Sequence, residues 1–257
     1  MANSKTEAQI EEKFMEELKH HLSGWHSKIK EDFGEKNFHN ELSLLQRDPV
    51  YSKFGFAIPE YVLVRLMGRF SISIGRRLGE IYDKVPRFVT SARFGLESDD
   101  VAPVFDGLQL DICVPISSLL DEDKQHVLSV FSGYFPEAEI GSGIGIEIRY
   151  NFNPNDSSRL RKDEKMASLL RDEGLFPTYL IFSDISPRGE AIARLKRAGW
   201  SFIVGKAAEE FMYNLVGMDF AKILDRPKIQ SEIRNEIDAL MSEMRNSKAF
   251  KQGAKLE

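Results

Sequence analysis

The sequence lacks the features that mark secreted and membrane proteins. Among its 257 residues there is one cysteine, Cys113, so no disulfide can form within the chain. No apolar run approaches the roughly eighteen residues that a membrane helix needs, and the first residues lack the apolar centre of a signal peptide. We therefore expect a protein of the reducing cytoplasm without a membrane segment. A hydrophobic content of 42% suffices for one large or two small globular domains.

Several common catalytic motifs are missing as well. The five histidines include no pair at metal-ligand spacing beside other ligands, and there is neither a nucleophile elbow nor a phosphate-binding loop. The glycines at 141, 143 and 145 precede a predicted strand instead of following one, which excludes a dinucleotide fingerprint. The net charge of -5 is unfavourable for a nucleic-acid binder, but it leaves room for a local basic groove.

Apolar spacing and turn residues predict an α/β protein with helices at both ends of the chain. The predicted helices cover 5–33, 37–47, 59–84, 119–134, a segment from Asp156 or Ser157 to Gly174, 187–198, 206–216 and 226–246. The predicted strands cover 88–94, 108–116, 143–151, 178–183 and 200–204. Strands that alternate with helices indicate one mixed β-sheet flanked by helices. We expect a helical N-terminal region over 1–58, an α/β core over 59–217, and C-terminal helices over 218–257 that pack on the core or at a dimer interface.

Two of the predicted strands place acidic side chains on one face. Alternate side chains of an extended chain share a face, so Gln109 and Asp111 lie opposite Leu108, Leu110 and Ile112. By the same rule Glu147 and Arg149 lie opposite Ile146, Ile148 and Tyr150. If the two strands pair, Asp111 and Glu147 converge on a hard cation beside a guanidinium. The alternative is a pair of edge-strand carboxylates that face water, with Glu147 paired to an arginine.

The order of these residues resembles the PD-(D/E)xK nuclease superfamily. A helix with Glu80, a strand with Asp111, a strand with Glu147-x-Arg149, and the run Asn-Asp-Ser-Ser-Arg-Leu-Arg-Lys-Asp that opens a helix carry the resemblance. The part from about 75 to 215 is similar to type II restriction endonucleases of the ApaLI-like kind, chiefly in the run from Ile146 to Arg159. The resemblance implies a restriction-endonuclease-like core and Mg²⁺-dependent hydrolysis of a DNA phosphodiester.

The resemblance also implies roles for particular residues. Asp111 and Glu147, with the main-chain carbonyl of Ile148, would hold Mg²⁺ against a phosphate oxygen, and Glu80 would be an outer or second metal ligand. Arg149 departs from the family, whose third residue is usually lysine. A guanidinium keeps its proton near neutral pH, so Arg149 would stabilise charge on the scissile phosphate and would not act as a general base.

Three further residues compete for these roles. Lys162 and Lys165, on the following helix, are candidates to supply the ammonium that the usual lysine provides. Asp106, at an Asp-Gly turn before its strand, is a second candidate for the aspartate role, although turn aspartates usually bond their own backbone.

The same helix carries the best local basic cluster for contacts to DNA phosphates. Its members are Arg159, Arg161, Lys162 and Lys165. Asp163 and Glu164 interrupt the cluster, so a solvated helix face is the competing interpretation.

These observations predict a Mg²⁺-dependent, site-specific endonuclease that acts on double-stranded DNA in the bacterial cytoplasm as a homodimer, since a twofold enzyme matches a palindromic site. The alternative function is a catalytically weak or inactive DNA-binding or protein-interaction module with the same fold, which Arg149 favours. A third possibility is that the acidic chain binds no nucleic acid.

Overall fold

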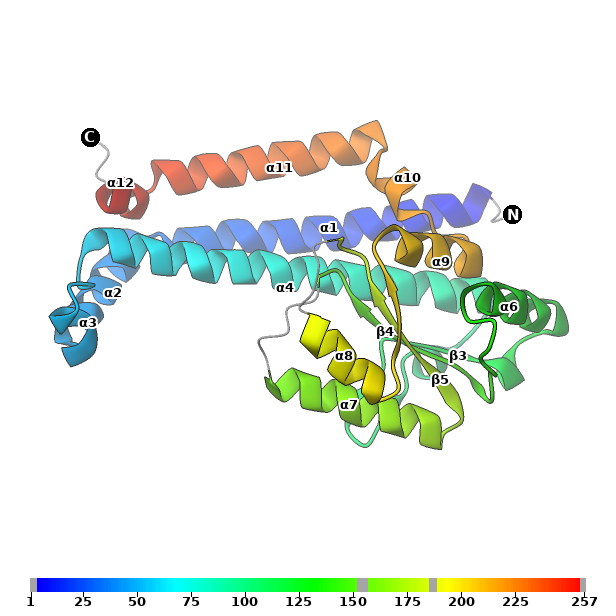
Figure 1. Cartoon of the computed structure of the whole chain (residues 1–257). Helices are drawn as coiled ribbons and strands as arrows, with labels where there is room; N and C mark the ends of the chain where they lie inside the picture. The colour runs from blue at the N-terminus through cyan, green and yellow to red at the C-terminus, as the bar shows by residue number, and fades with distance from the viewer. Residues whose placement is uncertain (1–3, 152–156, 185–188, 255–257) are drawn as a thin grey trace. The chain divides into compact units, whose positions relative to one another are not determined.

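The computed structural model describes residues 4–151, 157–184 and 189–254. Its α-helices are α1 (Ser4–Asp32), α2 (Glu35–Arg47), α3 (Pro49–Lys53), α4 (Pro59–Phe94), α5 (Ser98–Val101), α6 (Asp121–Tyr134), α7 (Ser157–Asp172), α8 (Gly189–Arg197), α9 (Lys206–Val216), α10 (Phe220–Leu224), α11 (Pro227–Asn246) and α12 (Lys248–Ala254) (Figure 1). Its strands are β1 (Val104–Phe105), β2 (Leu108–Gln109), β3 (Ile112–Pro115), β4 (Gly143–Arg149), β5 (Leu175–Ile181) and β6 (Ser201–Val204).

The chain forms two compact units. The sheet unit comprises Met1–Lys13 and Gly79–Ile223, and the helical unit comprises Phe14–Leu78 and Leu224–Glu257. This division differs from the predicted segments 1–58, 59–217 and 218–257. The helical unit combines an early and a late segment of the chain, 14–78 and 224–257, and ion pairs such as Lys248–Glu35 at 2.8 Å join these segments. The first part of α4 belongs to the same unit.

The predicted mixed sheet flanked by helices is confirmed. In the sheet unit, four strands lie in the order β3-β4-β5-β6. β3 is antiparallel to β4, whereas β4, β5 and β6 are parallel to one another. Parallel neighbours need a crossover, and α7 and α8 provide the two crossovers. These two helices lie together on one face of the sheet (Figure 1).

The predicted strand over 108–116 is interrupted. Asp106 (φ 45°) and Gly107 (φ 76°) form a turn that pairs β1 with β2 in a small hairpin of its own. The chain joins the main sheet only at Ile112, opposite Ile146. Asp111 therefore lies in the short link between two strands instead of in the middle of one.

The predicted strand over 88–94 is wrong, because α4 continues to Phe94. The buried side chains of this stretch follow a helical spacing. Ile81, Val85 and Val89 are at most 2% exposed and lie four residues apart. Burial of this stripe outweighs the preference of β-branched residues for strands and the presence of Pro86 within the helix. The stretch that was predicted as a strand therefore forms the last part of helix α4.

The two faces of the sheet are covered by different helices. Tyr179 and Ile181 of β5 pack with Leu170 of α7 and Leu195 of α8 in one apolar cluster. On the other face, Phe176 of β5 lies against Phe131 of α6, with ring centroids 4.7 Å apart. Glu147 and Arg149 share the face covered by α7, which places charged side chains at the end of an apolar layer.

Gly145 is the point of closest packing between β4 and α7. A Cβ at this position would lie 2.7 Å from a methyl group of Leu170, which is itself fully buried. We predict that Gly145→Ala lowers the free energy of unfolding by about 1–3 kcal/mol, because the added methyl overpacks the layer. Urea unfolding followed by circular dichroism measures the loss.

Gly133→Ala is the matched control for this substitution. Gly133 is in α6, and a Cβ there would meet no atom within 4 Å. Alanine should leave the unfolding free energy unchanged or raise it by up to about 1 kcal/mol. Equal losses in the two variants would contradict the tight packing of α7 on β4.

Candidate functional site

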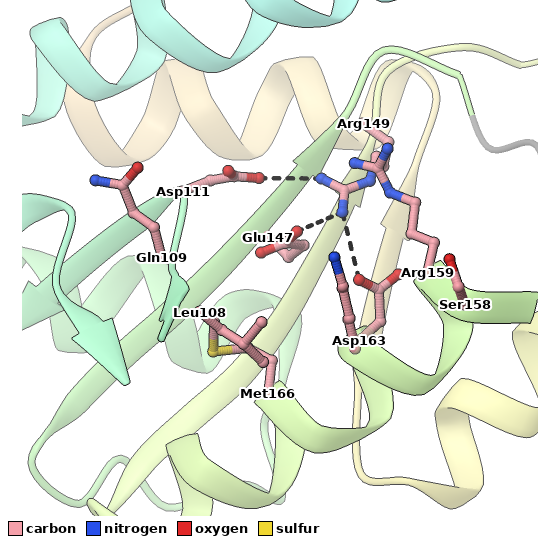
Figure 2. Close-up of a pocket in the computed structure, with 10 residues that line it drawn as sticks. Leu108, Gln109, Asp111, Glu147, Arg149, Ser158, Arg159, Asp163 and Met166 are labelled. Carbon is pink, nitrogen blue, oxygen red and sulfur yellow. Dashed lines mark hydrogen bonds and ion pairs between the residues drawn. The ribbon is translucent and has the colours of Figure 1, made fainter. Parts of the chain in front are cut away.

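A pocket of about 340 Å³ opens where β4 ends beside the first turns of α7 (Figure 2). Its lining includes Asp111, Glu147, Arg149, Arg159, Lys162 and Asp163. Three of these residues are the predicted catalytic group, and two are predicted contacts to DNA phosphates. The pocket thus gathers charged side chains from β4, from α7 and from the link between β2 and β3.

Pairing of β3 with β4 brings the two predicted metal ligands together. Ile112 lies opposite Ile146, and Asp111 and Glu147 are the next residues beyond that pair on their respective segments. The side chain of Asp111 extends the pairing, since its Oδ2 accepts a hydrogen bond of 2.8 Å from the main-chain N–H of Ile148. This hydrogen bond holds the side chain of Asp111 beside β4.

The guanidinium of Arg149 lies between the two carboxylates (Figure 2). Its Nη1 donates to Asp111 Oδ2 at 3.2 Å and to the carbonyl oxygen of Ile148 at 2.5 Å. Its Nη2 donates to Glu147 Oε1. Asp111 and Arg149 are 38 residues apart in sequence, so this contact depends on the pairing of the strands. Both side chains are only 14% exposed.

A third carboxylate, Asp163 of α7, approaches the same guanidinium. Its Oδ1 is 3.4 Å from Arg149 Nη2, and its Oδ2 accepts a hydrogen bond of 3.0 Å from the hydroxyl of Tyr179. The Tyr179 ring also lies beneath Arg149, whose Cζ is 5.6 Å from the ring centroid, a cation–π distance. The indole of Trp200 donates to the main-chain oxygen of Asp163 at 2.8 Å.

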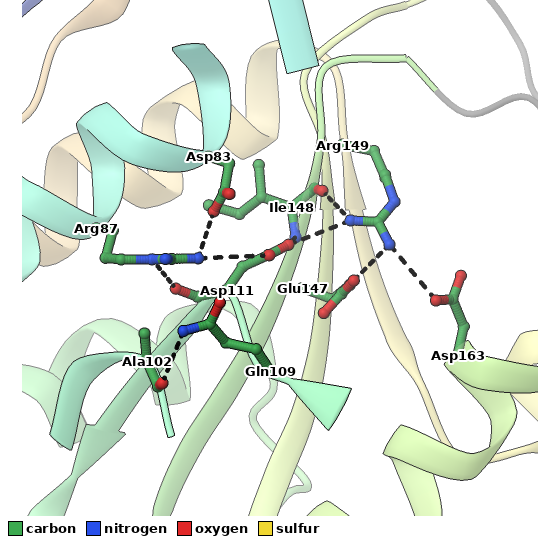
Figure 3. Close-up of polar contacts among 9 residues, drawn as sticks. All are labelled: Asp83, Arg87, Ala102, Gln109, Asp111, Glu147, Ile148, Arg149 and Asp163. Atoms are coloured by element: carbon green, nitrogen blue, oxygen red, sulfur yellow. Dashed lines mark hydrogen bonds and ion pairs between the residues drawn. The ribbon is translucent and has the colours of Figure 1, made fainter. Parts of the chain in front are cut away.

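The carboxylate that α4 contributes next to Asp111 is Asp83 (Figure 3). Arg87, one turn further along α4, donates from Nη2 to Asp83 at 2.8 Å and from Nε to the main-chain oxygen of Asp111 at 2.9 Å. Glu80 lies one turn before Asp83 and is outside the residues that line the pocket. Asp83 lies within the predicted helix 59–84, whereas Arg87 lies beyond its predicted end, so the sequence pattern did not place the two on one helix face.

The cluster around Arg149 contains more acids than bases. Its carboxyl groups are Asp83, Asp111, Glu147 and Asp163, and its guanidinium groups are Arg87 and Arg149. Burial raises the pKa of Glu147 to about 8, although Arg149 opposes the shift. Burial and the nearby charge of Asp111 raise the pKa of Asp83 to about 7. Burial also raises the pKa of Asp163.

Arg149 keeps its charge in this environment. Burial alone would lower the pKa of Arg149, but the attraction of Glu147 and the other acids raises it well above its ordinary value. Arg149 is therefore a permanent cation and cannot accept a proton from water.

Oxygen groups in and beside the pocket are of the type that a hard divalent cation binds. Asp111 and Glu147 supply carboxylate oxygens and Ile148 supplies a carbonyl oxygen, which are the ligand types that Mg²⁺ prefers. Glu147 Oε2 is buried and has no hydrogen-bond partner, so one carboxylate oxygen is left for a cation. The described residues contain no ready group of three or more acidic, histidine or cysteine side chains spaced for a metal ion.

The remaining predicted residues lie around the pocket or beyond it. Arg159 and Lys162 are in the lining, whereas the neighbouring Arg161 is exposed and outside it. Lys165 forms an ion pair with Asp106 at the surface, and this hydrogen bond lowers the pKa of Asp106. Asp106 is thus a turn residue, as its Asp-Gly pattern indicates. The predicted turn at 153–156 lies outside the described residues.

The comparisons with known proteins identify no family for the chain. No protein-family model matches it, and no curated protein or solved structure matches it. None of the described helices is long and apolar enough to cross a membrane.

The raised pKa of Glu147 predicts a stability that falls as the pH rises. The folded protein holds this proton up to about pH 8, whereas the unfolded chain releases it near the ordinary value of 4.5. Between these values the folded state binds more protons, so the free energy of unfolding decreases with pH by up to about 1.4 kcal/mol per pH unit for this group. Glu147→Gln, which stays neutral, should flatten the dependence measured by urea unfolding from pH 5 to 8.

Glu164→Gln is the control for this measurement. Glu164 pairs with Arg194 near the surface, and a hydrogen bond from that arginine lowers the pKa of Glu164. Its contribution to stability changes only below its ordinary pKa, so the slope from pH 5 to 8 should equal that of the unaltered protein. A Glu147→Gln curve parallel to the unaltered protein would contradict the raised pKa.

Proposed function

We propose that this chain is a Mg²⁺-dependent endonuclease that hydrolyses phosphodiester bonds of double-stranded DNA at specific sites. One observation carries the proposal. Asp111 and Glu147 converge from adjacent segments on one cationic group, in a pocket whose lining also holds Arg159 and Lys162. The resemblance of Asp111 and Glu147-x-Arg149 to PD-(D/E)xK nucleases, and in particular to type II restriction endonucleases, supports the reaction class.

In this proposal Asp111, Glu147 and the Ile148 carbonyl hold the metal. Bound Mg²⁺ would acidify a water ligand and neutralise charge that develops on the phosphate. Arg149 stays protonated, so it stabilises the negative charge of the scissile phosphate electrostatically. Asp163 and the ring of Tyr179 contact this guanidinium at the end of the strand.

The DNA backbone would lie along the first turns of α7. Arg159 and Lys162 are exposed there and line the same pocket as the carboxylates, so their charges would contact phosphates next to the scissile one. The chain as a whole carries a net charge of -5, so binding would depend on this local group. Action as a homodimer on a palindromic site, in the bacterial cytoplasm, completes the proposal.

The alternative is a DNA-binding or protein-interaction module with the same fold and weak or no catalysis. It is favoured by the position of Arg149, whose guanidinium is bonded to the same oxygens that would bind the metal. A salt-bridged cluster of this kind can also serve only to join β4 to α7.

The proposal predicts cleavage of DNA that depends on both carboxylates. Incubation of the purified protein with phage DNA and Mg²⁺, with Mn²⁺ in a parallel series, should give discrete fragments. Asp111→Asn and Glu147→Gln should each reduce the cleavage rate by about a thousandfold, because each removes an anionic ligand from the metal. Asp106→Asn, a surface carboxylate outside the pocket, should cleave at the normal rate.

Two results separate the candidate functions. Intact DNA over a wide range of protein concentration, with both metals, would contradict the nuclease proposal. Glu147→Ala should abolish cleavage and retain affinity for DNA if the chain is an enzyme, whereas a pure binding module has no cleavage to lose. Absence of salt-dependent binding to duplex DNA would contradict both functions.

The basic lining predicts a measurable salt dependence. Lys162→Ala and Arg159→Ala should each lower the slope of log K against log salt concentration by about 0.9, because each removes one phosphate contact. Fluorescence anisotropy of a labelled duplex, with Ca²⁺ in place of Mg²⁺, measures the slope. Lys206→Ala, at an exposed lysine of α9 outside the pocket, should leave the slope unchanged. Equal slopes in all four proteins would contradict the placement of DNA along α7.

A further inference from the structure

The guanidinium of Arg149 is bonded to every oxygen group that is proposed to hold the metal. Its Nη1 contacts Asp111 and the Ile148 carbonyl, and its Nη2 contacts Glu147. A divalent cation competes with the guanidinium in its present position, because Asp111 Oδ2, the Ile148 carbonyl and Glu147 Oε1 already accept its hydrogen bonds and Glu147 Oε2 alone of the Glu147 oxygens is without a partner. Binding of the metal therefore requires a movement of Arg149.

The direction of this movement is set by the fourth contact of the guanidinium. Asp163 is on α7, outside the proposed ligand group, and its distance of 3.4 Å to Arg149 is the longest of the four contacts. A small rotation of Arg149 away from β3 would shorten this contact. The ring of Tyr179 extends beneath the guanidinium and would remain in contact with it.

The carboxylate of Asp163 is held in position to accept a hydrogen bond from Arg149. It is 5% exposed, the Tyr179 hydroxyl holds one carboxylate oxygen, and the Trp200 indole holds the main chain of the same residue. Tyr179 is itself fully buried and packs against Trp200 at a ring-centroid distance of 5.2 Å. A carboxylate fixed in this way keeps its position while the guanidinium changes partners.

We propose that Arg149 is an internal competitor for the divalent cation and that Asp163 is the positioning residue that retains the guanidinium when the cation displaces it. The proposal rests on the metal site of the proposed function. It adds that the side chain in the place of the usual lysine sets the affinity for the metal. With the cation bound, Asp163 and Tyr179 would hold the guanidinium of Arg149, which would face the phosphate.

The test is the affinity of the full-length protein for Mn²⁺ without DNA, measured by isothermal titration calorimetry. Arg149→Met removes the competing charge and should bind Mn²⁺ at least about tenfold more tightly than the unaltered protein. Arg159→Met is the matched control, because it removes a second arginine from the lining of the same pocket. It should change the affinity by less than about threefold.

Asp163→Asn should weaken Mn²⁺ binding by about fivefold or more, since the displaced guanidinium loses its acceptor. If Asp163 acts through Arg149, Asp163→Asn should have little effect in the Arg149→Met background. A purely structural role of Asp163 would give the same loss in both backgrounds and would overturn its assignment as the positioning residue.

The unaltered protein provides a measurement that is independent of these variants. Nitrogen-15 spectra of the arginine side chains, with Arg149 assigned through Arg149→Lys, should show the Arg149 signals shifting as Mg²⁺ is added. The midpoint of this shift should equal the midpoint of metal binding. Bound metal with unshifted Arg149 signals, or an Arg149→Met affinity equal to or weaker than that of the unaltered protein, would overturn the proposal.

The two proposals fail in different ways. If the protein cleaves DNA but Arg149→Met binds Mn²⁺ no more tightly, the competition is wrong and the nuclease function stands. If Arg149→Met binds Mn²⁺ more tightly but no variant cleaves DNA, the competition stands and the nuclease function is wrong.

Discussion

The contact between the Arg149 guanidinium and three partly or fully buried carboxyl groups is the interaction on which the site depends. It joins β4 to the chain before β3 through Asp111, and to α7 through Asp163. Removal of charged groups from water is costly unless they are paired. The buried position of each of these acids therefore depends on its contact with the arginine. Tyr179 completes the arrangement by offering its ring to the guanidinium and its hydroxyl to Asp163.

The same interaction relates the two candidate functions. The cluster has more carboxyl groups than guanidinium groups, and burial holds the pKa of Glu147 and of Asp83 above their ordinary values. A cation that enters the pocket would favour the ionised form of these carboxyl groups, as the proposed nuclease centre requires. Without a metal, the ion pairs of Arg149 join β4 to α7, and the same residues form a structural salt-bridge cluster.

The pattern of the sequence predicted most helices and the alternation of strand faces, but it failed where burial overrode local preference. Residues 88–94 are rich in β-branched and aromatic side chains, and their expected strand is a part of α4. Asp83 was inside the predicted helix 59–84, but Glu80 was the acid of that helix that was compared with the two strands. Asp83 approaches Asp111 through the packing of α4 within the sheet unit, which local spacing does not encode.

The sequence by itself determined that Glu147 and Arg149 share one face of a strand, since the period of an extended chain is two residues wherever the strand is placed. It also placed Arg159 and Lys162 on the helix that follows. Only the tertiary structure decided that Asp111 meets Arg149, that Asp163 and Tyr179 enclose the guanidinium, and that Asp83 joins the group. These contacts join segments far apart in the chain, so they depend on strand register and on the packing of helices against the sheet.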